Sequence, residues 1–403
     1  MRPATDAPRG GGAAPSFRDL FLLRPDVVYL NHGSFGACPR PVFERYQAWQ
    51  RELEGQPVEF LGRRFEGLMR TARAALGEFV GADADDLAFF PNATTALNAV
   101  ARSLPLGPGD EVLSTDHEYG AVDRTWAFVC AKRGASYVRQ AISVPVHAAD
   151  QLVESVWSAV TPRTKVLSIS HITSTTAIVF PLADLLRRAR ERGIIAVVDG
   201  AHAPGQIALD LRALGADFYA GNCHQWMNAP KGSAFLYARR DVQPIVEPLV
   251  VSWGWRSDRP GPSRFVDEHG WQGTRDIAAF LTVPAAISFM RTHDWPAVRQ
   301  SCHELARRAR AGINALTGRP PLTPDDPAWF GQMATVALPP CDHEALQRRL
   351  YDDFSIEVPT FGWNGGSYLR VSAQAYNAAS DFETLLDALG EVLPGVGPTT
   401  GCR

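Results

Sequence analysis

Residues 166–199 read VLSISHITSTTAIVFPLADLLRRARERGIIAVVD, and this stretch predicts the fold. Its two ends, Val166–Ser170 and Ile194–Val198, are short apolar runs rich in β-branched residues, which is typical of buried strands. Between them, Pro181–Arg192 has the pattern of a basic amphipathic helix. A strand, a helix and a second strand in this order indicate a mostly parallel sheet covered by helices.

The same alternation continues on both sides of this stretch and then changes. It predicts helices at Phe65–Val80, Tyr119–Lys132 and Asp150–Val160 and strands at Glu111–Ser114, Asp217–Ala220 and Ala234–Tyr237. Beyond about residue 285 it predicts a long helix, three short strands and a last helix, at Trp295–Thr317, Ala334–Leu338, Ile356–Val358, Tyr368–Ser372 and Asp381–Leu393. We therefore expect a disordered arm over residues 1–15, a large α/β domain over 16–288 and a small α+β domain over 289–403. The first residues of the large domain, up to about residue 30, could instead pack on the small domain.

Composition excludes several classes of protein. The 403 residues include 40 Lys+Arg and 43 Asp+Glu, and this near-balance is not the footprint of a nucleic-acid-binding protein. The longest apolar stretch, Ile277–Met290, is too short to cross a bilayer, and the N-terminus lacks the apolar run of a signal peptide. The six cysteines show no metal-binding spacing. We expect a cytoplasmic protein with reduced thiols that holds no metal and contacts neither membrane nor nucleic acid.

Polar residues follow the predicted strands where ligands bind in open α/β sheets, at the carboxyl ends. Asp199 and His202 come directly after Ile194–Val198, and a carboxylate there needs hydrogen-bond donors or a cation unless it caps a helix. A loop at residues 221–232, which contains Asn222 and His224, follows the next strand. This loop also carries Trp226 and Met227, which are unusual in a surface turn.

Small and hydroxyl residues open a helix after the apolar run Leu87–Phe90. The stretch Pro91–Asn98 reads PNATTALN and contains Ala93 and Thr94. Free amides at a helix start can bind an anion, although a threonine there can also be an ordinary helix cap. The stretch is therefore a candidate anion site.

Taken together and in this order, these motifs resemble the pyridoxal-phosphate-dependent class V aminotransferase family, of fold type I. The resemblance is strongest to its isopenicillin N epimerase-like and cysteine C–S lyase-like branch, and it spans roughly Tyr29–Asn377. It includes the stretches Leu30–Gly36, Gly273–Asp276 and Leu369–Ser372. It implies a mostly parallel seven-stranded sheet in the large domain and pyridoxal 5'-phosphate as cofactor. It also implies an amino-acid substrate and a homodimer with shared active sites.

The resemblance implies a role for each matching residue. Asp199 would pair with the pyridine nitrogen and keep the ring protonated, so that the ring can accept electrons from Cα. The phosphate would be held by Ala93, Thr94, Asn222, His224 and, from a neighbouring subunit, Thr274. Ser174 and His202 would lie near the phenolic oxygen, and His117 would stack on the ring, with Tyr119 as the other candidate. Arg370 would bind the substrate α-carboxylate, because a guanidinium binds carboxylates in a bidentate way. Asn31, His32 and Tyr119 would complete the substrate side.

One residue departs from the family pattern. The family places its Schiff-base lysine directly after the loop histidine, where this chain has Gln225, and an amide is not a nucleophile. Lys231 is the nearest lysine and a weak substitute. Either the lysine of an active enzyme has been replaced, so that cofactor or an external aldimine is retained, or the chain is a natural lysine-less binding protein. The full set of cofactor residues and Arg370 favours the first, with catalysis impaired or lost.

The reaction is less determined than the cofactor. Persulfide-forming members of the family use a cysteine shortly before the arginine, and none lies between Pro359 and Arg370. C–S β-elimination, epimerisation and transamination remain, and the pocket decides among them. Trp253, Trp255 and Trp271 could wall the substrate side, or simply pack in the core. We favour a C–S β-lyase acting on a cysteine S-conjugate or sulfoxide in specialised metabolism.

Overall fold

The computed structural model describes residues 17–397, so the arm expected at residues 1–15 lies outside the described residues. A seven-stranded sheet forms the centre of the molecule, in the order β2-β8-β7-β6-β5-β3-β4. Neighbouring strands from β4 through β7 run parallel, whereas β8 is antiparallel to both β2 and β7. The strands are β2 (Leu87–Phe90), β3 (Glu111–Thr115), β4 (Ser136–Gln140), β5 (Thr164–Ser170), β6 (Ile195–Asp199), β7 (Phe218–Asn222) and β8 (Ala234–Ala238). The mostly parallel seven-stranded sheet is therefore confirmed.

Helices cover both faces of this sheet, which is why its strands read as continuous apolar runs. Successive side chains of a strand point to opposite faces, so Val197 joins one hydrophobic cluster and Val198 joins the other. The cluster of Val197 includes residues of α4 (Ala93–Ser103) and α5 (Gly120–Arg133). The cluster of Val198 includes residues of α3 (Phe65–Val80), α6 (Ala149–Trp157) and α7 (Leu182–Glu191).

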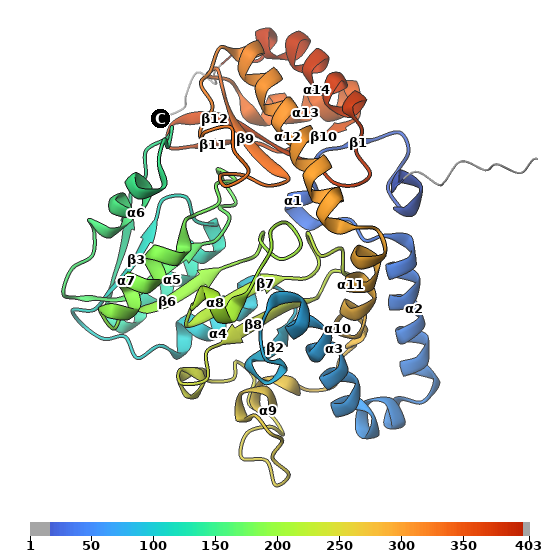
Figure 1. Cartoon of the computed structure of the whole chain (residues 1–403), viewed down its shortest axis with the longest axis vertical. Coiled ribbons are helices and arrows are strands. Elements are labelled where there is room, and N and C mark those ends of the chain that lie inside the picture. The colour runs from blue at the N-terminus through green and yellow to red at the C-terminus, as the bar shows by residue number, and fades with distance from the viewer. Residues whose placement is uncertain (1–16, 398–403) are drawn as a thin grey trace, which may run out of the picture.

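A smaller lobe is built on a three-stranded antiparallel sheet of order β11-β12-β9. Its elements are β9 (Met333–Leu338), β11 (Thr360–Trp363), β12 (Gly366–Ser372), α12 (Trp295–Thr317), α13 (His343–Phe354) and α14 (Ala379–Val392). The start of the described chain joins this lobe, because β1 (Val28–Tyr29) pairs in parallel with β10 (Ile356–Glu357). Figure 1 shows this blue N-terminal segment beside the orange and red elements of the lobe.

The remaining α-helices are distributed over the described part of the chain. They are α1 (His32–Phe35), α2 (Arg40–Gly55), α8 (Leu211–Leu214), α9 (Arg264–Gly270), α10 (Ala278–Leu281) and α11 (Val283–Thr292). Helices α2, α3, α10 and α11 pack on one another along one side of the molecule (Figure 1). In the described part of the chain, no helix is both long and apolar enough to cross a membrane.

Candidate functional site

A cavity of about 420 Å³ lies where β5, β6 and β7 end, beside the small lobe. The last residue of each strand, Ser170, Asp199 and Asn222, lies on its wall, as does Arg370 of β12. Most of the predicted site residues meet there: Ala93, Thr94, Tyr119, Ser174, Asp199, His202, Asn222, His224, Gln225 and Arg370. The cavity therefore brings together residues that lie far apart in the sequence.

One end of the cavity presents backbone amides at the start of α4. The Asn92 side chain caps this helix by accepting from the Thr95 N–H at 2.8 Å, and Asn222 Oδ1 accepts from the Ala93 N–H at 2.9 Å. Among the described residues, the Thr94 N–H has no protein acceptor. A helix N-terminus with a free amide favours an anion.

His224 also lines this cavity. Its Nδ1 is 2.8 Å from the carbonyl of Ser233, so Nδ1 carries a proton and donates. Burial lowers the pKa of His224, which keeps the ring neutral near neutral pH. Nε2 has no partner in the described part of the chain, and an anion bound beside it would favour its protonation.

Asp199 supplies a buried carboxylate with one open oxygen. Its Oδ1 accepts from the Ala201 N–H at 2.9 Å, and no described residue donates to Oδ2. The residue is only 5% exposed, and this burial raises the pKa of Asp199 to about 6. A carboxylate in this position is matched by a ligand that brings a cationic N–H group into the cavity.

His202 is held in one tautomer by Trp226. The Trp226 indole N–H donates to His202 Nδ1 at 3.3 Å, so the proton of the neutral ring lies on Nε2. Burial lowers the pKa of His202 to about 3, and the neutral form is therefore maintained. The ring can donate one hydrogen bond from Nε2 to an acceptor in the cavity.

Arg370 is a buried cation without a counter-ion. Its Nη1 donates to the carbonyl and hydroxyl of Ser174, and its Nη2 donates to the Ser34 hydroxyl at 3.3 Å. Within residues 17–397, its Nε has no partner and no carboxylate pairs with its guanidinium. Burial lowers the pKa of Arg370 to about 10, which still leaves it charged near neutral pH. A buried unpaired guanidinium is suited to a ligand carboxylate.

Gln225 is fixed on the cavity wall by its own hydrogen bonds. Its amide nitrogen donates to the carbonyls of Gly33 and Ser34 at 3.0 and 3.3 Å, and its amide oxygen accepts from Asn222 at 3.3 Å. Its backbone carbonyl is 3.0 Å from His32 Nε2. The side chain therefore ties α1 to the loop that follows β7.

Four predicted site residues do not line the cavity. His117 is fully buried, with its ring nitrogens 2.7 Å from the Thr176 hydroxyl and 2.8 Å from the Ile142 carbonyl. Its ring meets Trp363 edge-on at 4.6 Å, whereas Tyr119 lies on the cavity wall. The Asn31 amide donates a hydrogen bond to Glu357, and the His32 ring forms hydrogen bonds with the Tyr376 hydroxyl and the Gln225 carbonyl. Thr274 is exposed on the surface.

The tryptophans expected near the substrate are also placed elsewhere. Trp253 is 83% exposed and Trp255 is 44% exposed, while Trp271 packs edge-on against Phe65. None of the three is among the residues that line the cavity of this chain. Instead, Phe35, Tyr119 and Ile172 provide its apolar surface.

Several wall residues were not singled out from the sequence. They are Gly33, Ser34, Phe35, Asn92, Ser170, Ile172 and Ala201. Ser170 could have been found, because it ends a predicted strand next to the strand that ends in Asp199. Ser34 gave no such signal, since its contact with Arg370 joins distant parts of the chain.

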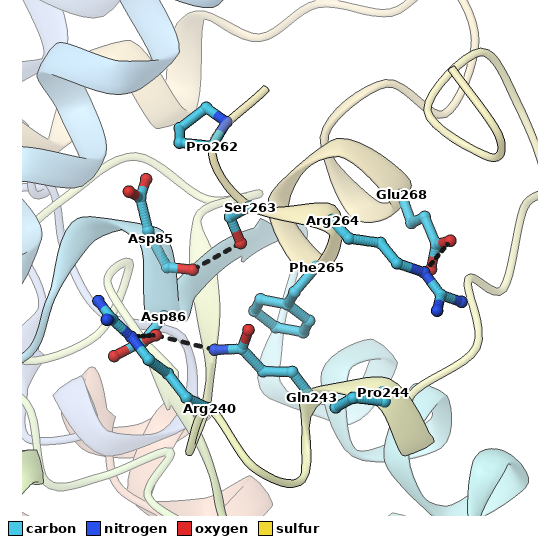
Figure 2. A pocket seen from close by; sticks show the side chains of 10 residues that line it. All are labelled: Asp85, Asp86, Arg240, Gln243, Pro244, Pro262, Ser263, Arg264, Phe265 and Glu268. Atoms are coloured by element: carbon cyan, nitrogen blue, oxygen red, sulfur yellow. Dashed lines mark hydrogen bonds and ion pairs between the residues drawn. The ribbon is translucent and has the colours of Figure 1, made fainter. Parts of the chain in front are cut away.

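A second cavity, of about 380 Å³, lies between η4 (Gln243–Ile245) and α9. Both arginines on its wall are paired with carboxylates: Arg240 with Asp86 at 3.0 Å and Arg264 with Glu268 at 2.7 Å (Figure 2). The Asp86 carboxylate also accepts from Gln243. Because both arginines that line the second cavity are already paired, they offer no free cation to a ligand, and the first cavity is the stronger candidate for chemistry.

The chain is similar to known proteins over most of its length. The sequence profile described as aminotransferase class-V matches residues 28–385. The chain is 39% identical to an isopenicillin N epimerase of Amycolatopsis lactamdurans, over 93% of this chain and 97% of the relative. It is 33% identical to a putative L-cysteine desulfhydrase of Oryza sativa subsp. japonica, over 91% and 83% of the two chains. A solved structure of a Lys-to-Ala mutant of C-DES, with glycine covalently linked to its PLP cofactor, superposes with a TM-score of 0.81. That likeness spans 93% of this chain and 98% of the other at 22% identity, and it shows the fold.

Proposed function

Because this chain belongs to the class V aminotransferase family, whose cofactor is pyridoxal 5'-phosphate, we propose that the cavity beside Arg370 binds this coenzyme and an amino acid. The preferred reaction is C–S β-elimination from a cysteine S-conjugate or its sulfoxide. When bound, the coenzyme supplies an electron sink for bond cleavage at Cα.

The residues on the cavity wall suit the two ends of this coenzyme. Asp199 would hold the ring nitrogen as N–H⁺, and Ala93, Thr94, Asn222 and His224 would hold the phosphate. His202 would donate from Nε2 to the phenolic oxygen, near Ser174. Tyr119, rather than the enclosed His117, would cover the ring face. Arg370 would orient the substrate through its α-carboxylate.

The observation that carries this proposal is that two buried charges of opposite sign, each without an ionic partner among the described residues, line the same cavity. Asp199 has an oxygen without a donor, and Arg370 has a guanidinium without a carboxylate, among the residues the structure describes. A coenzyme with a cationic ring and a substrate with a carboxylate neutralise both. If Asp199 and Arg370 had only a structural role, each charge would stay buried without an ionic partner, which destabilises the folded chain.

Relatives support a C–S lyase as the first choice and an epimerase as the second. Plant L-cysteine desulfhydrases and a hercynylcysteine sulfoxide lyase of Schizosaccharomyces pombe, which is 25% identical over 90% of this chain, favour C–S cleavage. The 39% identity to isopenicillin N epimerase favours epimerisation of an amino acid. Cys341 lies near Ser367 rather than on the cavity wall, so a persulfide-forming thiol is not supplied from there. Transamination is the remaining family reaction.

We further propose that Gln225 occupies the position of the Schiff-base lysine, so that turnover is impaired and ligands are retained. The chain has three lysines, Lys132, Lys165 and Lys231, and none of them lines the cavity. The hydrogen bonds of Gln225 to Gly33, Ser34 and Asn222 suit a residue that closes the wall without reacting. The alternative is a natural binding protein that uses the coenzyme without catalysis.

The test is the Gln225→Lys variant, compared with the unchanged chain and with Gln225→Met as a matched control of similar length. We expect the lysine variant alone to attach the coenzyme covalently, seen as a mass increase after borohydride reduction, and to release a product from cysteine conjugates. A lysine variant that attaches the coenzyme but transforms no amino acid, in a panel covering elimination, epimerisation and transamination, would contradict the enzyme proposal and favour the binding protein.

A further inference from the structure

A second buried acid, Glu118, contacts the cavity through the hydroxyl group of Ser170. Glu118, in the loop between β3 and α5, is only 4% exposed. Its Oε1 accepts from the Thr115 hydroxyl at 2.8 Å, and its Oε2 is 2.5 Å from Ser170 Oγ. Ser170 in turn lines the cavity and pairs in register with Asp199 on the neighbouring strand. Paired residues of parallel strands point to the same face, so Ser170 and Asp199 lie side by side at the ring end of the site.

No cation in the described part of the chain compensates the charge of Glu118. Among the described residues it forms no ion pair, and the charged groups that face it are acids, Asp199 from β6 and Asp123 from α5. Asp123 is itself bound to the Tyr137 hydroxyl at 2.6 Å and to Arg139. Tyr137 is a further titratable group near Glu118, and the charge of Glu118 contributes to raising the pKa of its hydroxyl. Burial, with a smaller effect of the two aspartates, raises the pKa of Glu118 to about 8.

We propose that Glu118 is a positioning residue for the ring end of the coenzyme, acting through the hydroxyl of Ser170. An ionised carboxylate can only accept, so Ser170 must then donate to Glu118 and turn its lone pairs to the cavity. A neutral Glu118 can donate to Ser170, whose own proton then points into the cavity as a second donor. The ionised form suits a cationic ring N–H group and the neutral form does not. This inference rests on the coenzyme site proposed above.

Linkage between proton binding and coenzyme binding gives the direction in which coenzyme affinity changes with pH. A ring cation bound beside Asp199 favours the ionised form of Glu118, and the ionised form favours the ring cation by the same factor. Affinity for the coenzyme should therefore rise as the pH passes the pKa of Glu118. The phosphate and ring of the free coenzyme titrate as well, but these solution equilibria are the same for every variant, so the difference between two pH profiles reports the missing acid.

The experiment measures the dissociation constant of pyridoxal 5'-phosphate for the full chain by fluorescence titration, from about pH 6.5 to about pH 9.5. The variants are Glu118→Gln and Ser170→Ala. The control is Glu111→Gln, which removes a buried acid paired with Arg163 at the opposite end of β3. We expect the unchanged chain and the control to gain affinity over this range by about threefold to tenfold more than Glu118→Gln. Ser170→Ala should lose at least half of that gain.

The outcomes separate this inference from the proposed function. If both variants follow the pH profile of the unchanged chain, the role of Glu118 is refuted while the coenzyme site stands. If Glu118→Gln does not fold, the Ser170→Ala profile decides the question alone. If the unchanged chain binds no coenzyme at any pH, the inference and the proposed function both fail.

Discussion

The buried carboxylate of Asp199 destabilises the folded chain when it is ionised and has no cationic partner. In the folded chain its pKa is raised by burial to about 6, above its ordinary value of 3.8. The folded state therefore binds this proton more tightly than the unfolded state. The ionised carboxylate begins to destabilise the fold as the pH rises past about 4, and the full penalty is present above about pH 6. A cationic ligand would remove this penalty.

We therefore expect Asp199→Asn to have opposite effects on stability and on function. Without coenzyme, it should raise the free energy of unfolding near neutral pH by an amount on the order of 2 kcal/mol, and the gain should vanish below about pH 4. Coenzyme affinity should fall at least about tenfold. Urea unfolding and coenzyme titration measure the two effects. Asp217→Asn is the control, because burial also raises the pKa of Asp217, which pairs with Arg239 away from the cavity. Its loss should likewise not lower stability near neutral pH, and it should leave coenzyme affinity unchanged. Equal coenzyme affinity in Asp199→Asn and the unchanged chain would contradict the assignment.

Arg370 is expected to recognise the substrate and not the coenzyme. Arg370→Lys keeps a charge but loses the planar pair of donors, so binding of a cysteine S-conjugate to the coenzyme-loaded chain should weaken about tenfold to a hundredfold. Coenzyme affinity should stay within about twofold of the unchanged chain. Spectroscopic titration with the conjugate, and with its decarboxylated amine as a second ligand, measures this. The amine should bind Arg370→Lys and the unchanged chain with equal affinity. If the affinity for the amine falls as much as that for the amino acid, Arg370 does not act through the substrate carboxylate.

At the scale of elements, α1 is pressed against the loop that carries His224 and Gln225. Gly36 follows the last residue of this helix and has a φ of +69°. A Cβ atom there would lie 2.2 Å from the His224 carbonyl oxygen and 2.9 Å from Gln225 Cα. This close approach of two backbones allows the Gln225 amide to reach Gly33 and Ser34. Only glycine fits this position.

Gly36→Ala should therefore cost more than about 2 kcal/mol of stability, because it combines an unfavourable backbone conformation with a clash. Gly318→Ala is a matched control, since Gly318 has a similar φ of +64° and no atom within 4 Å of an added Cβ. The control should cost about 1 kcal/mol, and chemical denaturation of both variants gives the comparison. Equal losses would mean that α1 and the loop are not in close contact.

Elements were easier to predict from the sequence than the contacts between them. The helices Phe65–Val80 and Trp295–Thr317 occur with the predicted bounds, because their apolar faces have a clear period. Strand β4 was missed because it is a polar edge strand, and α13 because its burial is confined to Leu346 and Leu350. Strand β2 was recognised only as an apolar run.

The choice between His117 and Tyr119 shows why the site could not be fully predicted. The two residues belong to one short motif, and local pattern does not tell which ring faces the cavity. The hairpin of β11 and β12 decides this, because Trp363 donates to the Asp116 carbonyl at 2.9 Å and packs against His117. Such a contact between distant segments leaves no signal in the motif, whereas strand-end positions such as Asp199 do.

At the scale of the whole molecule, we propose that Thr274 serves the site of a neighbouring chain. Thr274 is exposed and does not line the cavity of its own chain. Several large apolar side chains are also exposed, including Trp253, Val251 and Phe35. Exposed apolar residues of this size are typical of surfaces that contact another protein. A homodimer in which Thr274 reaches the phosphate of the partner's site remains our proposal.

Mixing two defective variants tests this arrangement. In homodimers of Thr274→Ala and in those of Asp199→Asn, the affinity for the coenzyme should be about tenfold or more below that of the unchanged chain. In the mixed dimer, one site would combine the intact Asp199 of one chain with the intact Thr274 of the other. Dissociation and remixing should therefore restore native affinity to one site of every mixed dimer. No restoration, with mixed dimers demonstrated by native mass spectrometry, would show that the two residues do not share a site across the interface.

The most direct measurement of the central claim is a crystal structure of the unchanged chain grown with excess pyridoxal 5'-phosphate. We predict coenzyme density in the cavity, with the ring nitrogen within hydrogen-bonding distance of Asp199 and the phosphate at the start of α4 beside Asn222 and His224. A cavity without density under these conditions, or a coenzyme bound with its ring nitrogen away from Asp199, would contradict the account.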